Sequence, residues 1–475
     1  MKAIPLRLAA LLIVLGLLAA APAPAAAQSD ERAAFDAEEI AEELAERGEP
    51  DQPLLLADEL SDNPLLWHLH NYGQIQGGSA DADIDWPEAM AIDDRDPRYD
   101  NRIGVIDSGI SFTHPELHGK ICEQEIPGND IDDDGNGFID DAWGWDFIQN
   151  DKLPQDTNGH GTFVSGLIAA RNSPDGMGAI GAAREACIVA IRVFGNSGQG
   201  KLSTMLAGIR YAVRLRLPVV NISAGITDHS PALAREIRRA RAQGVLIVAA
   251  AGNNGANSDK HPFYPAALPG EHVVSVAAST AADHLADFSN WGRKTVDLAA
   301  PGRSVRSTRH IGDVGGGSGT SYAAPLVSAA ASEVLRRAPQ LGPRAVRRKL
   351  LAGVDKKSAL AGRMASGGRL SIAGALERVG SDRKTYRPAK LRAKRLGKAR
   401  GSRTQRRKHR FVRFSWKPGE AGQRFWLVVD GQVRKSLPRG KKRVRIRLAK
   451  RRHRAFVIAA DRAGNEARSR QIRFR

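Results

Sequence analysis

Residues 102–109 read RIGVIDSG, a short apolar run that ends in an aspartate, a serine and a glycine. Its β-branched residues predict a buried strand, and the serine and glycine that follow Asp107 predict a turn. In α/β proteins ligands bind at the carboxyl ends of parallel strands, so Asp107 lies where a functional site is expected. An aspartate in such a turn also commonly acts as a cap, so this stretch alone does not assign its role.

Short β-branched runs alternate with alanine-rich stretches throughout the predicted main domain, residues 63–380. Strands are predicted at residues 102–107, 187–193, 218–223, 245–250, 273–277 and 296–298. Helices are predicted, from apolar residues that recur three and four positions apart, at residues 162–170, 202–216 and 231–243. This alternation predicts an α/β fold with a doubly wound, mostly parallel sheet and helices on both faces.

A histidine and a serine complete the groups that catalysis by a serine nucleophile requires. His160 lies between glycines in NGHGT, residues 158–162, ahead of an apolar helix stripe. Ser321 lies in GTSYAAP, residues 319–325, at the start of an alanine-rich helix whose exposed N–H groups favour a developing anion. Because a nucleophilic serine needs a base and a carboxylate that orients the base, we predict these roles for His160 and Asp107. Taken singly, such a histidine or helix-capping serine is more often structural.

Asn253 follows another predicted strand in AAAGNNG, residues 249–255. Its side-chain amide and the backbone N–H of Ser321 are predicted to form an oxyanion hole, which stabilises the negative charge of a tetrahedral intermediate. The adjacent Asn254 is a rival for this role, and either asparagine could simply form a turn.

These four motifs, in the order Asp, His, Asn and Ser, resemble the catalytic domain of the subtilase family of subtilisin-like serine proteases. The resemblance extends from about Pro64 to Ala375. It implies a subtilisin-like fold and a serine endopeptidase that hydrolyses polypeptide substrates through an acyl-enzyme intermediate, with no cofactor in catalysis.

The resemblance also implies where the substrate binds. Ser223, Ala224 and Gly225 are implied to form an edge strand that pairs with the substrate backbone. Ala251 and Gly252 are implied to form the opposite wall of the pocket.

The chain departs from the family pattern in two places. Tyr322 stands where a methionine is common after the nucleophile, which should leave the chemistry intact but change packing or sensitivity to oxidation. Only 35 residues separate the predicted cleavage site from Asn63, too few for the usual folded inhibitory pro-domain. Self-processing by that route is therefore in doubt.

Residues 130–141 read DIDDDGNGFIDD, which follows the Asp-x-Asp-x-Asp-Gly pattern of calcium-binding loops. Oxygen ligands at alternating positions can surround one hard cation, and the glycine allows a sharp turn. The pattern predicts a structural calcium ion with the ligands Asp130, Asp132, Asp134, Asn136 and Asp141. A solvated acidic loop without an ion is the alternative.

The net charge of +19 is divided unevenly along the chain. Residues 385–475 contain 32 Lys and Arg against four Asp and Glu residues, so this region carries +28 and the remainder −9. A polar run of Lys, Arg, Gly and Ser predicts a basic linker at 381–410. Beyond it, apolar and aromatic residues recur at strand spacing, which predicts a small β-sandwich-like, immunoglobulin-like domain at 411–475. We expect its aromatic residues to form a core, and its charge to bind an anionic cell-surface polymer without a dedicated nucleic-acid site. A basic domain that has no partner is the alternative.

Residues 1–27 have a basic start, a short apolar run and a small-residue cleavage site, the pattern of a secretory signal peptide. We therefore expect a secreted, monomeric protein that can associate with the cell envelope. Residues 28–62 contain 13 acidic residues and two arginines, and they are predicted to be an acidic spacer or a short pro-segment.

Cys122 and Cys187 could pair in an oxidising compartment or remain as two buried thiols, and the sequence leaves both open.

Two functions compete at this point. The first is a secreted serine endopeptidase, in which every expected catalytic position is filled. The second is a secreted protein that binds polyanions or the cell wall and carries an accessory or inactive protease domain.

Overall fold

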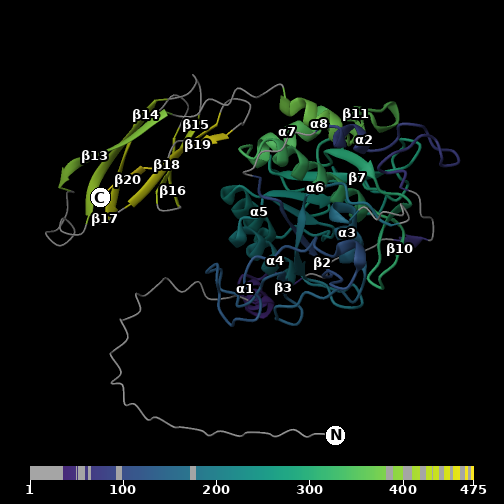
Figure 1. Ribbon diagram of the computed structural model, residues 1–475, viewed down its shortest axis with the longest axis horizontal. Helices are drawn as coiled ribbons and strands as arrows, with labels where there is room; N and C mark the ends of the chain where they lie inside the picture. The colour runs from purple at the N-terminus through teal and green to yellow at the C-terminus, as the bar shows by residue number, and fades with distance from the viewer. Residues whose placement is uncertain are drawn as a thin grey trace, which may run out of the picture.

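The computed structural model describes a large α/β domain, part of the N-terminal segment and two small C-terminal sheets (Figure 1). The described residues are 36–49, 51, 59–61, 66–92, 99–171, 178–183, 185–380, 389–398, 409–417, 424–429, 432–437, 443–449, 453–460, 466–468 and 472–474. The predicted signal peptide and most of the predicted basic linker lie outside these residues. None of the described helices is both long enough and apolar enough to cross a membrane.

The α/β domain is built on a nine-stranded sheet in the order β11-β12-β8-β7-β6-β5-β2-β4-β3. Its neighbouring strands run parallel, except for β11 and β12. The strands are β2 (Arg102–Asp107), β3 (Gly144–Asp146), β4 (Cys187–Arg192), β5 (Val219–Ile222), β6 (Leu246–Ala250), β7 (Val273–Ser279), β8 (Leu298–Pro301), β11 (Asp355–Lys356) and β12 (Gly368–Arg369). The predicted mostly parallel sheet is therefore confirmed, although β8 begins at Leu298 rather than Val296.

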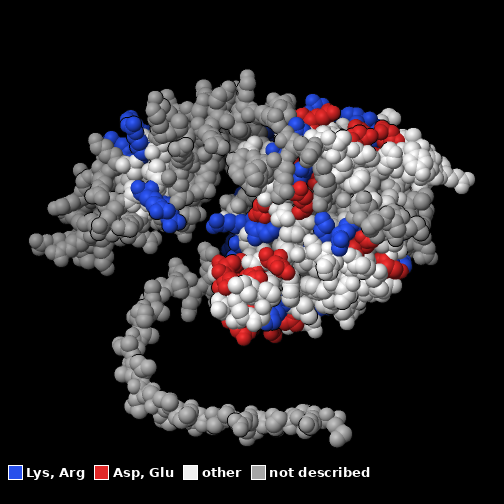
Figure 2. Space-filling model, in the orientation of Figure 1, with Lys and Arg blue, Asp and Glu red and all other residues white. Residues whose placement is uncertain are grey.

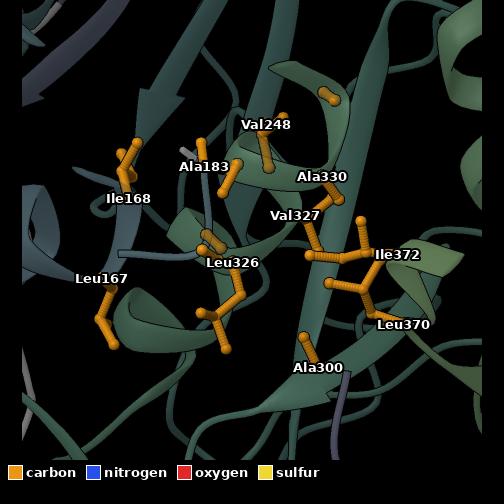
Figure 3. Packing of buried hydrophobic residues seen from close by; sticks show 14 of the residues in the cluster. Leu167, Ile168, Ala183, Val248, Ala300, Leu326, Val327, Ala330, Leu370 and Ile372 are labelled. Carbon is orange, nitrogen blue, oxygen red and sulfur yellow. The ribbon is translucent and has the colours of Figure 1, made fainter. Parts of the chain in front are cut away.

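Helices cover both faces of this sheet, as predicted. The helices of the domain are α2 (Trp86–Met90), α3 (His160–Ala169), α4 (Leu202–Leu215), α5 (Pro231–Gln243), α6 (Thr320–Arg337), α7 (Pro343–Gly353) and α8 (Ile372–Gly380), with short 3-10 turns at Pro115–Leu117 and Ser358–Leu360. On β2, Ile103 and Val105 belong to a core with α3 and α6, whereas Ile106 belongs to a second core with α4 and α5. Figure 3 shows part of the first core, where Leu326 and Val327 of α6 pack.

The loop between β8 and α6 forms an antiparallel hairpin of β9 (Val305–Thr308) and β10 (Val314–Ser318). A strand from the N-terminal segment, β1 (Glu59–Ser61), pairs antiparallel with β10 and places Glu59 opposite Ser318. The edge of β10 that leads into α6 is thus paired with residues from the predicted spacer or pro-segment.

The acidic residues of this N-terminal segment bind the starts of two helices. The first helix, α1 (Ala37–Glu46), packs against α4. Beyond it, Glu49 Oε2 accepts a hydrogen bond from the N–H of Ala232 at 2.8 Å, in the first turn of α5. Asp51 accepts hydrogen bonds from the N–H and the hydroxyl of Ser203, both at 2.7 Å, in the first turn of α4. Because helix N-termini expose N–H groups and carry partial positive charge, these two carboxylates hold the segment on the α/β domain.

The two cysteines, whose pairing the sequence left open, are joined as a disulfide. Cys187 is the first residue of β4, and the N–H of Cys122 donates to the carbonyl oxygen of Ile188 at 2.9 Å. The bond ties the stem of the acidic loop to the central sheet.

The C-terminal region contains two antiparallel sheets, as predicted for a small β-rich domain. One sheet comprises β13 (Ala389–Lys398), β14 (His409–Lys417) and β17 (Arg443–Ala449). The other comprises β15 (Arg424–Val429), β16 (Gln432–Leu437), β18 (His453–Ala460), β19 (Glu466–Arg468) and β20 (Ile472–Phe474). Phe414, Trp416 and Phe425 are buried together, which confirms that these aromatic residues form a core.

The first strand of this region begins inside the predicted linker. β13 starts at Ala389 and pairs with β14 along its length, and Leu391 is buried. Residues 389–398 are rich in Lys and Arg, so the sequence alone gives no clear apolar face. In the paired strand, Leu391 and Ala393 pack into the core of the C-terminal sheets. Residues 389–398 and 409–410 of the predicted linker, 381–410, are therefore strand residues.

Candidate active site

The ends of β2 and α3 hold the predicted carboxylate and base in contact. Asp107 is the fully buried last residue of β2, and His160 is the first residue of α3. The Nδ1 atom of His160 lies 2.7 Å from Oδ1 of Asp107, and the backbone N–H of Ser108 donates to the same oxygen at 2.8 Å. Donation from Nδ1–H to the carboxylate makes Nε2 the basic nitrogen of the ring.

Two glycines allow α3 to approach β2 this closely. A Cβ atom on Gly161 would lie 2.2 Å from the carbonyl oxygen of Gly109 and 3.2 Å from Cβ of Asp107. Gly109 itself has a φ of +104°, a backbone conformation that favours glycine. The glycines beside Asp107 and His160 are thus a steric requirement of the contact between these two residues.

Asp156, which the sequence patterns did not single out, connects the turn after Asp107 to the start of α3. Its Oδ1 accepts hydrogen bonds from the hydroxyl of Ser108 at 2.9 Å and from the N–H of Gly159 at 2.8 Å. Its Oδ2 accepts one from the N–H of Thr162 at 2.9 Å. The carboxylate is buried and caps the first turn of α3. An acidic residue just before a predicted helix start is the signal that could have identified it.

Helix α6 brings the predicted nucleophile to the same edge of the sheet. Ser321, the second residue of α6, is 4% exposed. Its hydroxyl donates to the carbonyl oxygen of Ser223 at 2.9 Å, and the hydroxyl of Ser223 donates to the carbonyl oxygen of Ser321 at 2.8 Å. The ring of the next residue, Tyr322, lies 5.5 Å from the ring of His160 between centroids. The predicted nucleophile and base therefore lie at the N-terminal ends of two helices that pack together.

Asn253, rather than Asn254, lies against the start of α6. Oδ1 of Asn253 accepts hydrogen bonds from the N–H of Thr320 at 2.9 Å and from its hydroxyl at 2.8 Å. These bonds place the amide nitrogen of Asn253 on the opposite side of the side chain. Asn254 is exposed, and its backbone N–H donates to Asn290. The structure therefore favours Asn253 over its neighbour as the amide donor beside Ser321.

Asn290 holds the loop that carries Asn253, and sequence reasoning did not assign it this role. Its amide nitrogen donates to the carbonyl oxygen of Ala251 at 2.9 Å. Its Oδ1 accepts hydrogen bonds from the N–H groups of Asn254 at 3.0 Å and Ala256 at 2.9 Å. Because Asn290 and this loop are far apart in sequence, only the folded chain reveals the contact.

The two implied substrate walls follow neighbouring strands. Ser223, Ala224 and Gly225 come after β5, and Ala251 and Gly252 come after β6, with which β5 pairs in parallel. Both walls therefore lie at the carboxyl edge of the sheet, where parallel sheets bind ligands.

The predicted calcium loop brings two of its five predicted ligands together with a residue that precedes it. Carboxylate oxygens of Asp132, Asp134 and Glu125 lie within 4.8 Å of one another. Glu125 lies before the loop pattern begins, so the twelve-residue motif could not identify it. An oxygen-only set of carboxylates is the chemistry that hard divalent cations prefer.

The other three predicted ligands, Asp130, Asn136 and Asp141, take part in hydrogen bonds within the loop. The backbone N–H of Asp130 donates to the carboxylate of Asp140 at 3.3 Å, within a turn where Asp130 has a positive φ of 56°. Oδ1 of Asn136 accepts from the N–H of Phe138 at 2.7 Å, and its amide donates to Oδ2 of Asp141 at 2.8 Å. Hydrogen bonds of the loop thus hold Asn136 Oδ1 and Asp141 Oδ2, as they also hold both carboxylate oxygens of Asp132.

The carboxyl groups of this region crowd one another. Burial, together with the neighbouring Glu125, raises the pKa of Asp141 to about 7. The same two causes, burial first, raise the pKa of Asp134. Oδ1 of Asp141 is buried without a hydrogen-bond partner among the described residues. A cation close to these groups would offset their mutual repulsion.

Together, these groups can perform acyl transfer. A buried carboxylate orients an imidazole, a serine hydroxyl lies at a helix N-terminus nearby, and an amide donor lies beside that serine. Nucleophile, base and oxyanion donors are the parts that hydrolysis through a serine requires.

Comparisons with known proteins agree with this chemistry. The sequence model of the Subtilase family matches residues 100–369, more than half of the chain. The chain is 36% identical to the thermophilic serine proteinase of Bacillus sp. (strain AK1) over 230 residues. The matched region covers 48% of the chain and 51% of that protein. It is 34% identical to thermitase of Thermoactinomyces vulgaris over 230 residues, and this region covers 48% of the chain and 73% of that protein. The chain thus spans about half the length of the first relative and more of the second.

A solved structure shows the same fold. The crystal structure of a cold adapted subtilisin-like serine proteinase is similar with a TM-score of 0.50 and 28% sequence identity. The similarity covers 65% of this chain and 98% of that chain.

We predict that Asp156→Ala slows the reaction of Ser321 with an organophosphonate that labels nucleophilic serines by roughly 100-fold, because His160 is then held less accurately. The rate of covalent labelling, followed by mass spectrometry, measures the effect. Asp151→Ala is the control, since Asp151 is a partly exposed acidic residue whose carboxylate accepts a hydrogen bond, among the described residues, only from the nearby N–H of Leu153. Equal labelling rates for Asp156→Ala and the unchanged protein would contradict this positioning role.

Proposed function

The chain belongs to the subtilase family of serine peptidases, and we propose that it is a secreted endopeptidase with Asp107, His160 and Ser321 as its catalytic triad. Family membership assigns a hydrolase that acts on polypeptides. The observation that carries the triad is the 2.7 Å contact between His160 Nδ1 and Asp107 Oδ1, next to the start of α6. The alternative, a binding protein with an inactive protease domain, has no support in the comparisons.

In the proposed reaction, Ser321 attacks the carbonyl carbon of a substrate peptide bond while Nε2 of His160 accepts the serine proton. The Ser321 hydroxyl donates to the Ser223 carbonyl in the structure, so this hydrogen bond must break when the proton passes to the imidazole. Asp107 keeps the ring oriented and stabilises the imidazolium. His160 then gives the proton to the leaving amine, and water cleaves the acyl-enzyme by the same steps.

The negative charge of the tetrahedral intermediate is proposed to be stabilised by the side-chain amide of Asn253 and the N–H of Ser321. The two bonds from Thr320 to Oδ1 of Asn253 support this role, because they orient the amide before substrate arrives. The N–H of Ser321 lies in the first turn of α6, where the helix dipole favours negative charge.

We predict that Ser321→Ala abolishes peptide hydrolysis without unfolding the protein, because the role of the hydroxyl is chemical.

We also predict that Asn253→Ala lowers kcat roughly 100-fold with little change in KM. Removal of an oxyanion donor weakens binding of the transition state, not of the substrate. Steady-state kinetics on a peptide substrate measures both effects, and Asn254→Ala is the matched control. Near-normal turnover in Ser321→Ala would refute the triad, and a loss in Asn254→Ala alone would move the amide donor by one residue.

Secretion is proposed from residues 1–27, which have the composition of a signal peptide. Residues 28–62 are proposed to act as a short pro-segment rather than a free spacer. Support comes from the caps that Glu49 and Asp51 place on α5 and α4, and from the pairing of β1 with β10 just before Ser321.

Calcium is proposed to bind at Glu125, Asp132 and Asp134, with a stabilising role and no part in catalysis. The proximity of their oxygens and the unpartnered buried oxygen of Asp141 both fit a hard cation. When bound, the ion would supply positive charge that neutralises the crowded carboxylates.

We predict that calcium raises the melting temperature by about 5 °C when it is present well above its Kd, because it binds only the folded state. Asp134→Asn should reduce this shift strongly. The adjacent Asp133→Asn is the control, since Asp133 lies outside the acidic group. Thermal unfolding with calcium and with a chelator tests this, and an undiminished shift in Asp134→Asn would place the ion elsewhere.

The C-terminal sheets are proposed to hold the enzyme on an anionic cell-surface polymer. Arg413 on β14 lies opposite Arg445 on β17, and Arg454 on β18 lies opposite Arg473 on β20, all of them exposed. These opposed pairs concentrate positive charge on the exposed faces of the two sheets, where a polyanion would be attracted. Figure 2 shows Lys and Arg on the described part of these sheets, whereas both signs of charge mix over the α/β domain.

We predict that a protein truncated at Ser381 cleaves small peptides normally but is no longer retained on anionic beads. Retention of the full chain should fall steeply between about 50 and 200 mM salt, because binding releases counterions. Binding and peptide cleavage are measured on both proteins. Equal retention of both, or loss of peptide cleavage on truncation, would contradict a tethering role.

A further inference from the structure

An aromatic ring lies between the two substrate walls. A Cβ atom built on Gly225, in the first wall, would lie 2.6 Å from Cε1 and 2.8 Å from Cζ of Phe263. A Cβ atom built on Gly252, in the second wall, would lie 3.0 Å from Cγ and 3.2 Å from Cδ1 of the same ring. The tip of the Phe263 ring therefore touches one wall and its base touches the other.

The backbone around Phe263 holds the ring in this place. Ile226, the residue after Gly225, exchanges two backbone hydrogen bonds with Tyr264, each at 2.9 Å. The carbonyl oxygen of Phe263 accepts a bond from the N–H of Ala267 at 2.8 Å. Phe263 is only 5% exposed, so the ring is packed rather than free to turn into solvent.

The space between the walls is where the substrate side chain next to the cleaved bond must lie. The carbonyl oxygen of Ser223, in the first wall, bonds to the hydroxyl of Ser321. Asn253, the proposed oxyanion donor, directly follows Gly252 in the second wall. A substrate residue whose carbonyl carbon is attacked by Ser321 is therefore flanked by both walls, and its side chain extends between them.

We propose that Phe263 fills this space and restricts the residue on the N-terminal side of the cleaved bond to small side chains such as Gly, Ala and Ser. The inference rests on the proposed function, because it takes the two walls to be the substrate site. A large side chain would have to displace the packed ring of Phe263. The ring has no free space on either side, because Gly225 and Gly252 leave no room even for a Cβ atom beside it. Small side chains need no such rearrangement.

The test uses peptide substrates that differ only in the residue before the cleaved bond. For the unchanged enzyme, we expect kcat/KM for alanine to exceed that for phenylalanine by about 100-fold or more. Phe263→Ala should raise kcat/KM for the phenylalanine substrate by about 100-fold, while the value for the alanine substrate changes by less than about tenfold. Phe263→Leu, which preserves more of the packing, should shift the preference toward medium-sized side chains.

Phe147→Ala is the matched control, because Phe147 is also a buried phenylalanine, and it packs against Phe138 and Tyr211. It should leave the preference for alanine unchanged. Equal cleavage after phenylalanine and alanine by the unchanged enzyme would overturn the inference and leave the proposed function standing. An identical preference in Phe263→Ala and Phe263→Leu would also overturn it. Failure to cleave either peptide, with Ser321 unlabelled by a serine reagent, would overturn both proposals.

Discussion

The burial of α6 on every side is the constraint on which the active site depends. Every residue from Thr320 to Arg336 is buried, and the helix packs against β5, β6, β7, β8 and three other helices. Its many small alanine side chains allow these elements to approach closely, as in any helix enclosed by a core. Within it, the charged pair of Glu333 and Arg336 is joined at 2.7 Å, so burial of these charges is compensated. A helix packed in this way cannot slide along its axis, and Ser321 therefore stays at the carboxyl edge of the sheet.

A buried chain of polar side chains links this helix to the substrate wall. The hydroxyl of Ser328, two turns into α6, donates to Oδ1 of Asn221 at 2.9 Å. The amide of Asn221 donates to the hydroxyl of Ser223 at 2.8 Å, which in turn donates to the carbonyl oxygen of Ser321 at 2.8 Å. Because each buried member has a partner, the network specifies one relative position of α6 and β5. Ser321, the proposed nucleophile, and Ser223, in the first proposed wall, are thus positioned by the same set of bonds.

Local patterns in the sequence were sufficient for six strands of the central sheet and for α3, α4 and α5, because strand and helix periodicity and glycine-bounded turns are short-range signals. They were insufficient where a role depends on contacts between distant segments. Asp156 acts through the turn after Asp107, 48 residues away in sequence, and Glu125 joins the acidic group from outside the loop motif. The N–H of Asp130 donates to the carboxylate of Asp140, a contact that the loop motif does not predict. Periodicity therefore predicts elements, whereas side chains that connect elements must be found in the fold.

Tyr322, which stands where the family commonly has methionine, shows how one substitution depends on its surroundings. Its ring packs against Phe163 of α3 at 4.3 Å between centroids and lies beside His160. A Cβ atom on Gly317 of β10 would lie 2.6 Å from the Tyr322 ring and 3.0 Å from that of Phe163. The larger ring at position 322 therefore requires glycine at position 317. Since an aromatic ring lacks the thioether that oxidises to a sulfoxide, the contact between α3 and α6 beside His160 avoids that lesion.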